Sequence, residues 1–71
     1  MLADGAYDVF VVDAAALPDG ALDLELTILS GDRKGELVTL QARNLGVDEL
    51  EALGMPGTLL VADGAPSLVL E

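Results

Sequence analysis

The chain has 71 residues, of which 52% are apolar, and it contains neither cysteine nor histidine. So short a chain forms one domain (residues 1–71), and neither disulfides nor a Cys/His zinc site can stabilise it. We therefore expect a closed sheet, self-association, or both. Thirteen acidic residues against three basic ones give a net charge of −10, which disfavours binding to nucleic-acid phosphates and to anionic lipids.

Residues 7–13 predict the first strand, and the residues before it predict a frayed lead-in. The apolar side chains of this strand divide between two faces, with Tyr7, Val9 and Val11 on one and Phe10 and Val12 on the other. Strands of this kind are typically covered on both sides. We interpret one face as the lining of a barrel. The other face either lies beneath a bent neighbouring strand or contacts a partner.

A connector at residues 14–20, with a turn at Pro18-Asp19-Gly20, leads to the central hairpin at residues 21–42. Its first strand has a period of two, which places one apolar set on one face: Leu22, Leu24, Leu26 and Ile28. The turn at residues 30–35 is bounded by two glycines and is otherwise polar. The returning strand places Val38, Leu40 and Ala42 on one face.

Residues 44–54 predict a short helix. Val47, Leu50 and Leu53 form an apolar stripe, and carboxylates in the early turns favour the positive end of the helix dipole. Gly54 and Pro56 predict the end of the helix. We expect the stripe to cover one end of a barrel.

A second hairpin is predicted at residues 58–62 and 67–70, with a tight turn at Asp63-Gly64 and a loop lengthened by residues 65–66. The resulting order is three strands, a helix and two strands. This order is typical of a mainly β, five-stranded OB-like Greek-key barrel with one short helix between strands 3 and 4. The alternative is an SH3-like barrel, whose helical turn precedes its last strand. The strand pair after Gly57 favours the OB-like order.

The segment from Leu29 to Val38 (LSGDRKGELV) ends one strand, turns through basic residues between glycines and begins another. This pattern resembles the soluble β-domain of YibE/F-like membrane proteins and small OB-like proteins of high-GC bacteria. The resemblance covers about 20 residues and consists mainly of the pattern of a hairpin flanked by glycines. It implies a small β-barrel domain and supplies no catalytic residues. The membrane helices that follow this domain in YibE/F-like proteins have no counterpart in this sequence.

Catalytic side chains are scarce. There is no histidine to act as a general base and no cysteine nucleophile, and Ser30 and Ser67 lie in or beside predicted turns. The carboxylates at residues 19–25 and 48–51 lack the spacing of a calcium loop. We therefore predict that the protein is not an enzyme and has no cofactor and no metal site.

Arg33 and Lys34 form the main positive spot, at the tip of the central hairpin. We favour a solvated turn there, and the alternative is contact with a phosphate or an acidic partner. OB domains that bind single-stranded nucleic acid stack bases on aromatic residues of the second and third strands. The corresponding strands here contain no aromatic residue, so we do not expect nucleic-acid binding.

The sequence favours a non-catalytic interaction module that binds a protein or associates with itself. The candidate surface comprises Tyr7, Phe10, Val12, Leu29 and Leu37. The alternatives are a single-stranded nucleic-acid-binding OB domain and a carrier of a small molecule or cation at the barrel mouth. Without a long apolar run or a basic signal region at its start, the chain is expected to be soluble and cytoplasmic, with no membrane partner.

Overall fold

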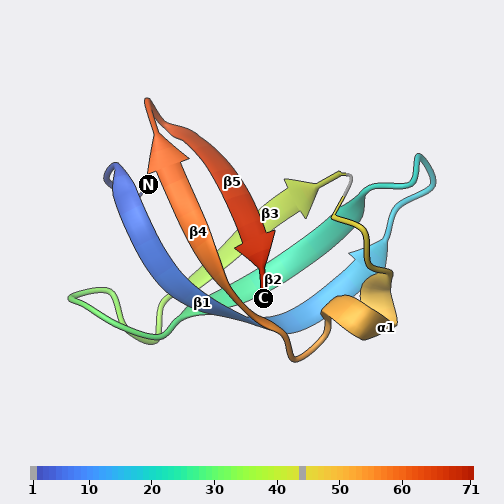
Figure 1. The fold of residues 1–71 in the computed structure, drawn as a ribbon, viewed down its shortest axis with the longest axis horizontal. Coiled ribbons are helices and arrows are strands. Elements are labelled where there is room, and N and C mark those ends of the chain that lie inside the picture. Colours follow the sequence, from blue (N-terminus) through green and yellow to red (C-terminus); the bar gives the residue numbers. More distant parts are fainter. Residues whose placement is uncertain (1, 44) are drawn as a thin grey trace.

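The computed structural model describes residues 2–43 and 45–71. Its elements follow the predicted order: β1 (Gly5–Ala16), β2 (Leu22–Ile28), β3 (Leu37–Ala42), α1 (Glu49–Ala52), β4 (Pro56–Ala62) and β5 (Ala65–Leu70). The strands form one antiparallel sheet in the spatial order β3-β2-β1-β4-β5. Figure 1 shows this sheet curled into a half-barrel, with β4 and β5 in front of β2 and β3.

β1 is the central strand and pairs with two neighbours. Its first half pairs with β4, and its second half pairs with β2 up to Ala16. The register with β2 shifts between Val11 and Asp13, so Val12 is the extra residue of a β-bulge. A bulge bends its strand and increases the local twist, which lets one strand serve both sides of a curled sheet. The predicted first strand was too short at both ends. Gly5 and Ala6, which were predicted to belong to a frayed lead-in, pair with β4, and residues 14–16 continue the pairing with β2.

The core lies on the concave face of the sheet. The four alternating residues of the central hairpin are all buried there, as predicted, together with Val9 and Val11 of β1 and Leu59 and Val61 of β4. Val38, Leu40 and Ala42 also face the core, but each is only half buried. The interior is therefore densest beneath β1 and β2 and thins toward the two ends of the sheet.

The last hairpin is tighter than predicted. Asp63 and Gly64 have φ values of 53° and 76°, and Ala62 pairs directly with Ala65. Positive φ at both central residues is the geometry of a two-residue type I′ turn. Ala65 and Pro66 therefore belong to β5 and do not lengthen the loop.

The predicted helix was too long, and of the three residues in its predicted apolar stripe, Val47 packs against the core whereas Leu50 and Leu53 do not. α1 spans Glu49–Ala52, and its buried residue is Ala52, whereas Leu50 and Leu53 are 78% and 49% exposed. Asn44, the start of the predicted helix, lies outside the described residues. Gly46 has a φ of 79°, which is incompatible with an α-helix, and Asp48 begins the helix with a capping box. One turn is too short to present a complete stripe.

The sheet does not close into the expected cylinder. β3 and β5 are the two edge strands, and within residues 2–43 and 45–71 no ladder of hydrogen bonds joins them. Every ladder in the sheet is antiparallel, so β3 and β5 both have the direction of β1, and only a parallel ladder could join them.

In the part of the chain that the structure describes, no helix is long and apolar enough to span a bilayer.

Candidate interaction surfaces

The convex face of the sheet carries a row of side chains that crosses four strands. Leu37 of β3 pairs with Thr27, Thr27 with Phe10, and Phe10 with Pro56. Residues paired across neighbouring strands project on the same face. Leu37 is 61% exposed and Phe10 is half buried. The first row therefore begins and ends with apolar groups on the side away from the core.

A second row adds apolar groups from the last hairpin. The backbone N–H of Leu29 donates to the Asp8 carbonyl at 2.8 Å, Asp8 pairs with Thr58, and Thr58 pairs with Val69, which is 55% exposed. Beyond this row, Leu60 pairs with Ala6 and Ser67 and is also exposed. Val69 and Leu60 were not among the predicted surface residues, although alternation along residues 58–62 and 67–70 places them opposite Leu59, Val61, Leu68 and Leu70.

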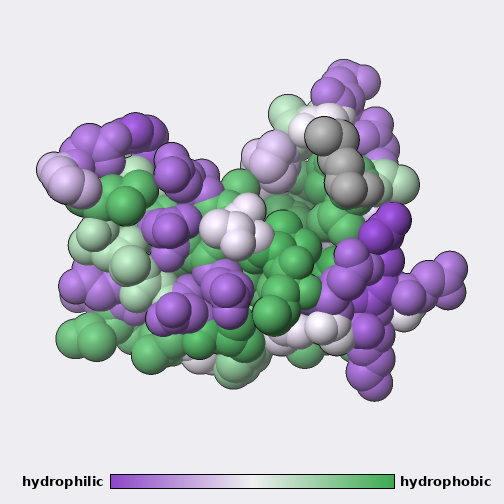
Figure 2. Space-filling view, turned by 180° about the vertical axis from the view of Figure 1, so that it is seen from behind, coloured by the Kyte–Doolittle hydropathy of each residue, from purple (hydrophilic) through white to green (hydrophobic). Residues whose placement is uncertain are grey.

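We define the convex apolar surface by its six members, which are Phe10, Val12, Leu29, Leu37, Leu60 and Val69. Figure 2 shows apolar surface along the lower edge of the molecule, the side on which β1 crosses the bottom of Figure 1. Single exposed apolar residues are ordinary, whereas a group of them on one face marks a candidate for contact with another molecule.

Tyr7 lies on the opposite face from the other four predicted surface residues. It pairs with the buried Leu59, packs against the core, and donates its hydroxyl to the Ala3 carbonyl. The structure thus brings together Phe10, Val12, Leu29 and Leu37 but excludes Tyr7 from the convex apolar surface. In a strand, residues 7 and 10 project on opposite faces, so the sequence alone could have separated Tyr7 from Phe10.

The helical segment adds exposed apolar groups near the bulge of β1. The Gly54 N–H donates to the Val11 carbonyl at 2.9 Å, and the Val11 N–H donates to the Met55 carbonyl at 3.0 Å. These bonds hold the end of α1 against β1 and leave Leu50 and Leu53 on the surface. Two of the three residues that were predicted to cover the end of the barrel therefore lie on the surface, and the third, Val47, packs against the core.

Of the two residues predicted to contact an anion, Arg33 already forms an ion pair within the chain. Arg33 Nη1 donates to both carboxylate oxygens of Glu36 at 3.1 Å. Lys34 forms no ion pair among the described residues. Arg43, the third basic residue, pairs with Asp19 at 2.5 Å. The hydrogen bond from Arg43, together with one from the Ala21 N–H, lowers the pKa of Asp19.

The polar groups beside the sheet have structural partners. Ser30 Oγ donates to Asp8 Oδ2 at 3.3 Å, and Asp48 Oδ1 accepts from the Glu51 N–H at 2.8 Å as the cap of α1. Among the described residues, no group of three or more acidic side chains is placed to hold a metal ion. The predicted cation carrier has no such cluster to support it.

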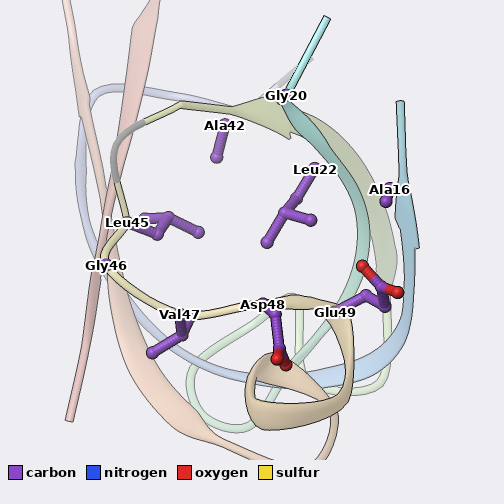
Figure 3. Close-up of a pocket in the computed structure, with 9 residues that line it drawn as sticks. All are labelled: Ala16, Gly20, Leu22, Ala42, Leu45, Gly46, Val47, Asp48 and Glu49. Atoms are coloured by element: carbon purple, nitrogen blue, oxygen red, sulfur yellow. The ribbon is translucent and has the colours of Figure 1, made fainter. Parts of the chain in front are cut away.

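A pocket of about 460 Å³ lies at the end of the half-barrel, between the β1–β2 turn and the segment before α1. Figure 3 shows Leu22, Leu45 and Ala42 projecting into it, while Asp48 turns toward the helix that it caps. The pocket is therefore lined both by apolar side chains and by the acidic residues Asp48 and Glu49. The predicted small-molecule carrier would use this pocket, and that function stays a prediction.

Comparison with known proteins finds no matching family model, no matching curated protein and no matching solved structure. The resemblance to the β-domain of YibE/F-like proteins therefore stays a prediction.

Proposed function

We propose that the chain is a non-catalytic interaction module with an OB-like fold, which binds a protein partner or a second copy through the convex apolar surface. The observation that carries this proposal is the exposure of apolar side chains from β1, β3, β4 and β5 on one face of the sheet. Apolar faces on small domains are favourable contact surfaces because their burial releases water.

The strand arrangement supports the OB-like assignment. A five-stranded OB barrel is partly open and carries its helix between strands 3 and 4. This chain has the same order of elements, a bulged first strand shared by two neighbours, and an incomplete closure between β3 and β5. The Greek-key identity itself is part of the proposal.

The side-chain inventory supports a role without catalysis. The chain has no histidine or cysteine, and the Ser30 hydroxyl donates to the carboxylate of Asp8. Asp48 and Glu51 satisfy each other's backbone groups at the start of α1. Because these polar groups already have partners within the chain, the convex apolar surface would bind a partner mainly through apolar packing and complementary shape.

The substitution Leu37→Asp tests the proposal, because Leu37 is exposed at the edge of the convex apolar surface and its replacement leaves the core intact. We expect the wild-type chain either to associate in light scattering or to capture a specific protein from host lysate. Leu37→Asp should weaken that association at least about tenfold, as expected for a charge buried in an apolar contact.

Leu50→Asp is the matched control, since Leu50 is more exposed and lies on α1, outside the defined surface. It should leave the association unchanged. A wild-type chain that is strictly monomeric and captures nothing would contradict the proposal, as would equal losses in both variants.

A further inference from the structure

The convex face of the sheet changes from apolar to acidic along β2. Asp23, Glu25 and Thr27 alternate with the buried core residues of this strand, so all three project on the convex face. Asp13 of β1 pairs directly with Glu25 and projects on the same face. We call Asp13, Asp23 and Glu25 the acidic patch. The three residues line one hollow of about 220 Å³ together with Thr39.

The acidic patch has no counter-charge within residues 2–43 and 45–71. The two ion pairs formed there are at other sites, and they are Arg33–Glu36 and Arg43–Asp19. Like charges that lie directly opposite each other in an antiparallel pair repel and destabilise the pair. A bound cationic group would therefore relieve a repulsion that the free chain retains between Asp13 and Glu25.

The acidic patch adjoins the convex apolar surface. Thr27 pairs with Phe10 and lies two residues from Glu25 along β2, which corresponds to about 7 Å. Val12, the bulge residue of β1, directly precedes Asp13. A partner that covers Phe10 and Val12 therefore brings its own side chains within reach of the acidic patch.

The curvature of the sheet argues against a second copy as the partner. Figure 1 shows the sheet curled into a half-barrel, and the convex apolar surface lies on the outside of this curl. Two outward-curved faces touch over a small area, whereas a specific interface usually buries about 800 Å² on each partner. A partner with a concave surface can follow the curl and reach such an area.

The basic residues of the chain also argue against a second copy. There are three of them, which are Arg33, Lys34 and Arg43. Arg43 is already paired with Asp19. The other two lie in the hairpin turn together with Asp32 and Glu36, so two positive and two negative charges leave residues 30–36 without net charge. A second copy therefore offers little positive charge to the acidic patch.

We infer that the convex face binds a different protein, whose contact surface is a concave apolar groove with Lys or Arg side chains along one border. This inference rests on the proposed function and names which of its two partners the surface takes. The groove covers the convex apolar surface, and its basic border lies over the acidic patch. The charges mainly orient the partner and speed association, while the apolar contact provides most of the affinity.

Selection from a displayed library of protein fragments of the source organism, with the full chain as bait, supplies the probe. The fragment that binds best is then titrated against the wild-type chain and its variants by fluorescence anisotropy. Leu37→Asp should weaken its binding at least about tenfold. Binding to the wild-type chain should also weaken as the salt concentration rises, because a basic border contributes to it.

Matched charge variants test the basic border itself. The pair Asp23→Asn and Glu25→Gln removes two charges from the acidic patch. We expect it to weaken fragment binding about three- to tenfold and to reduce the salt dependence. Its urea midpoint should not fall, because the substitutions remove a repulsion.

The control pair, Glu49→Gln and Asp63→Asn, removes the same charge from α1 and from the β4–β5 turn, outside the convex face. Asparagine tolerates the positive φ of residue 63. This pair should change fragment binding less than about twofold.

The outcomes separate this inference from the proposed function. Equal binding by the two charge pairs, with Leu37→Asp still disruptive, would overturn the basic border and leave the proposed function intact. Wild-type dimers in light scattering that Leu37→Asp dissociates would assign the convex face to a second copy and overturn the inference alone. A fragment that binds Leu37→Asp as tightly as the wild type, or a selection that enriches no fragment on a monomeric chain, would overturn both.

Discussion

Gly57 is the residue at which the sheet has least room. It is buried in β4 between Val9 and Leu70, and a Cβ at this position would lie 2.6 Å from the Val69 carbonyl oxygen and 3.1 Å from Leu70 Cδ2. Backbone cannot move aside as a flexible side chain can, so any larger residue must push β5 away from β4. Glycine is needed at position 57 because the two strands pack closely there, whereas glycine at positions 46 and 64 allows a positive φ.

Gly57→Ala should therefore lower the free energy of unfolding by about 1–3 kcal/mol, the usual cost of an added group in a packed site. Urea denaturation measures this change. Thr58→Ala is the control, because Thr58 is on the opposite face, and it should cost less than about 1 kcal/mol. Equal effects of the two substitutions would show that β4 and β5 are not in close contact at Gly57.

At the scale of elements, the strands were predicted well and the helix was not. Alternation identified β2 and both of its faces, because one side of that strand is fully buried. The bulge at Val12 and the continuation of β1 through Ala14–Ala16 depend on pairing with β2, which no local pattern encodes. The helix failed for a similar reason, since a glycine at positive φ and the bonds to Val11 determine its length and orientation.

The convex apolar surface was also predictable only in part. Four of its residues followed from alternation in β1 and from the positions that flank the hairpin turn, and the separation of Tyr7 was also available from the period of two. That β3 and β5 are the edge strands was not predictable, because it follows only once β1 is known to pair with both β2 and β4.

The capping box of α1 gives a prediction at this scale. Asp48 Oδ1 accepts from the Glu51 N–H at 2.8 Å, and the Glu51 carboxylate accepts from the Asp48 N–H at 3.5 Å. Asp48→Ala should reduce the free energy of unfolding by about 1 kcal/mol, because a one-turn helix has little other support. Asp48→Asn retains a capping oxygen and should cost clearly less in the same denaturation experiment. If both variants were as stable as the wild type, the cap would not hold the segment.

The whole molecule is an acidic half-barrel whose core is densest at its centre and thinnest at its two edges. This shape leaves the convex apolar surface on one side of the sheet and two edge strands, β3 and β5, at its borders. Both follow from the same cause, a short chain with five antiparallel strands that curls but does not close. The central claim is therefore that β3 and β5 are unpaired with each other in the free protein.

Amide hydrogen exchange measured residue by residue by NMR tests this claim most directly. In an antiparallel pair, backbone N–H groups point alternately toward and away from the partner strand, counted here from the bonds Ile28 N–H to Glu36 O and Glu71 N–H to Pro56 O. In the free chain, we therefore predict fast exchange at Thr39, Gln41 and Leu68, whose N–H groups point away from β2 or β4, and slow exchange at Val38 and Leu40, whose N–H groups face β2. Uniformly slow exchange along β3 and β5 would show that the two strands are already paired, and it would contradict the half-barrel.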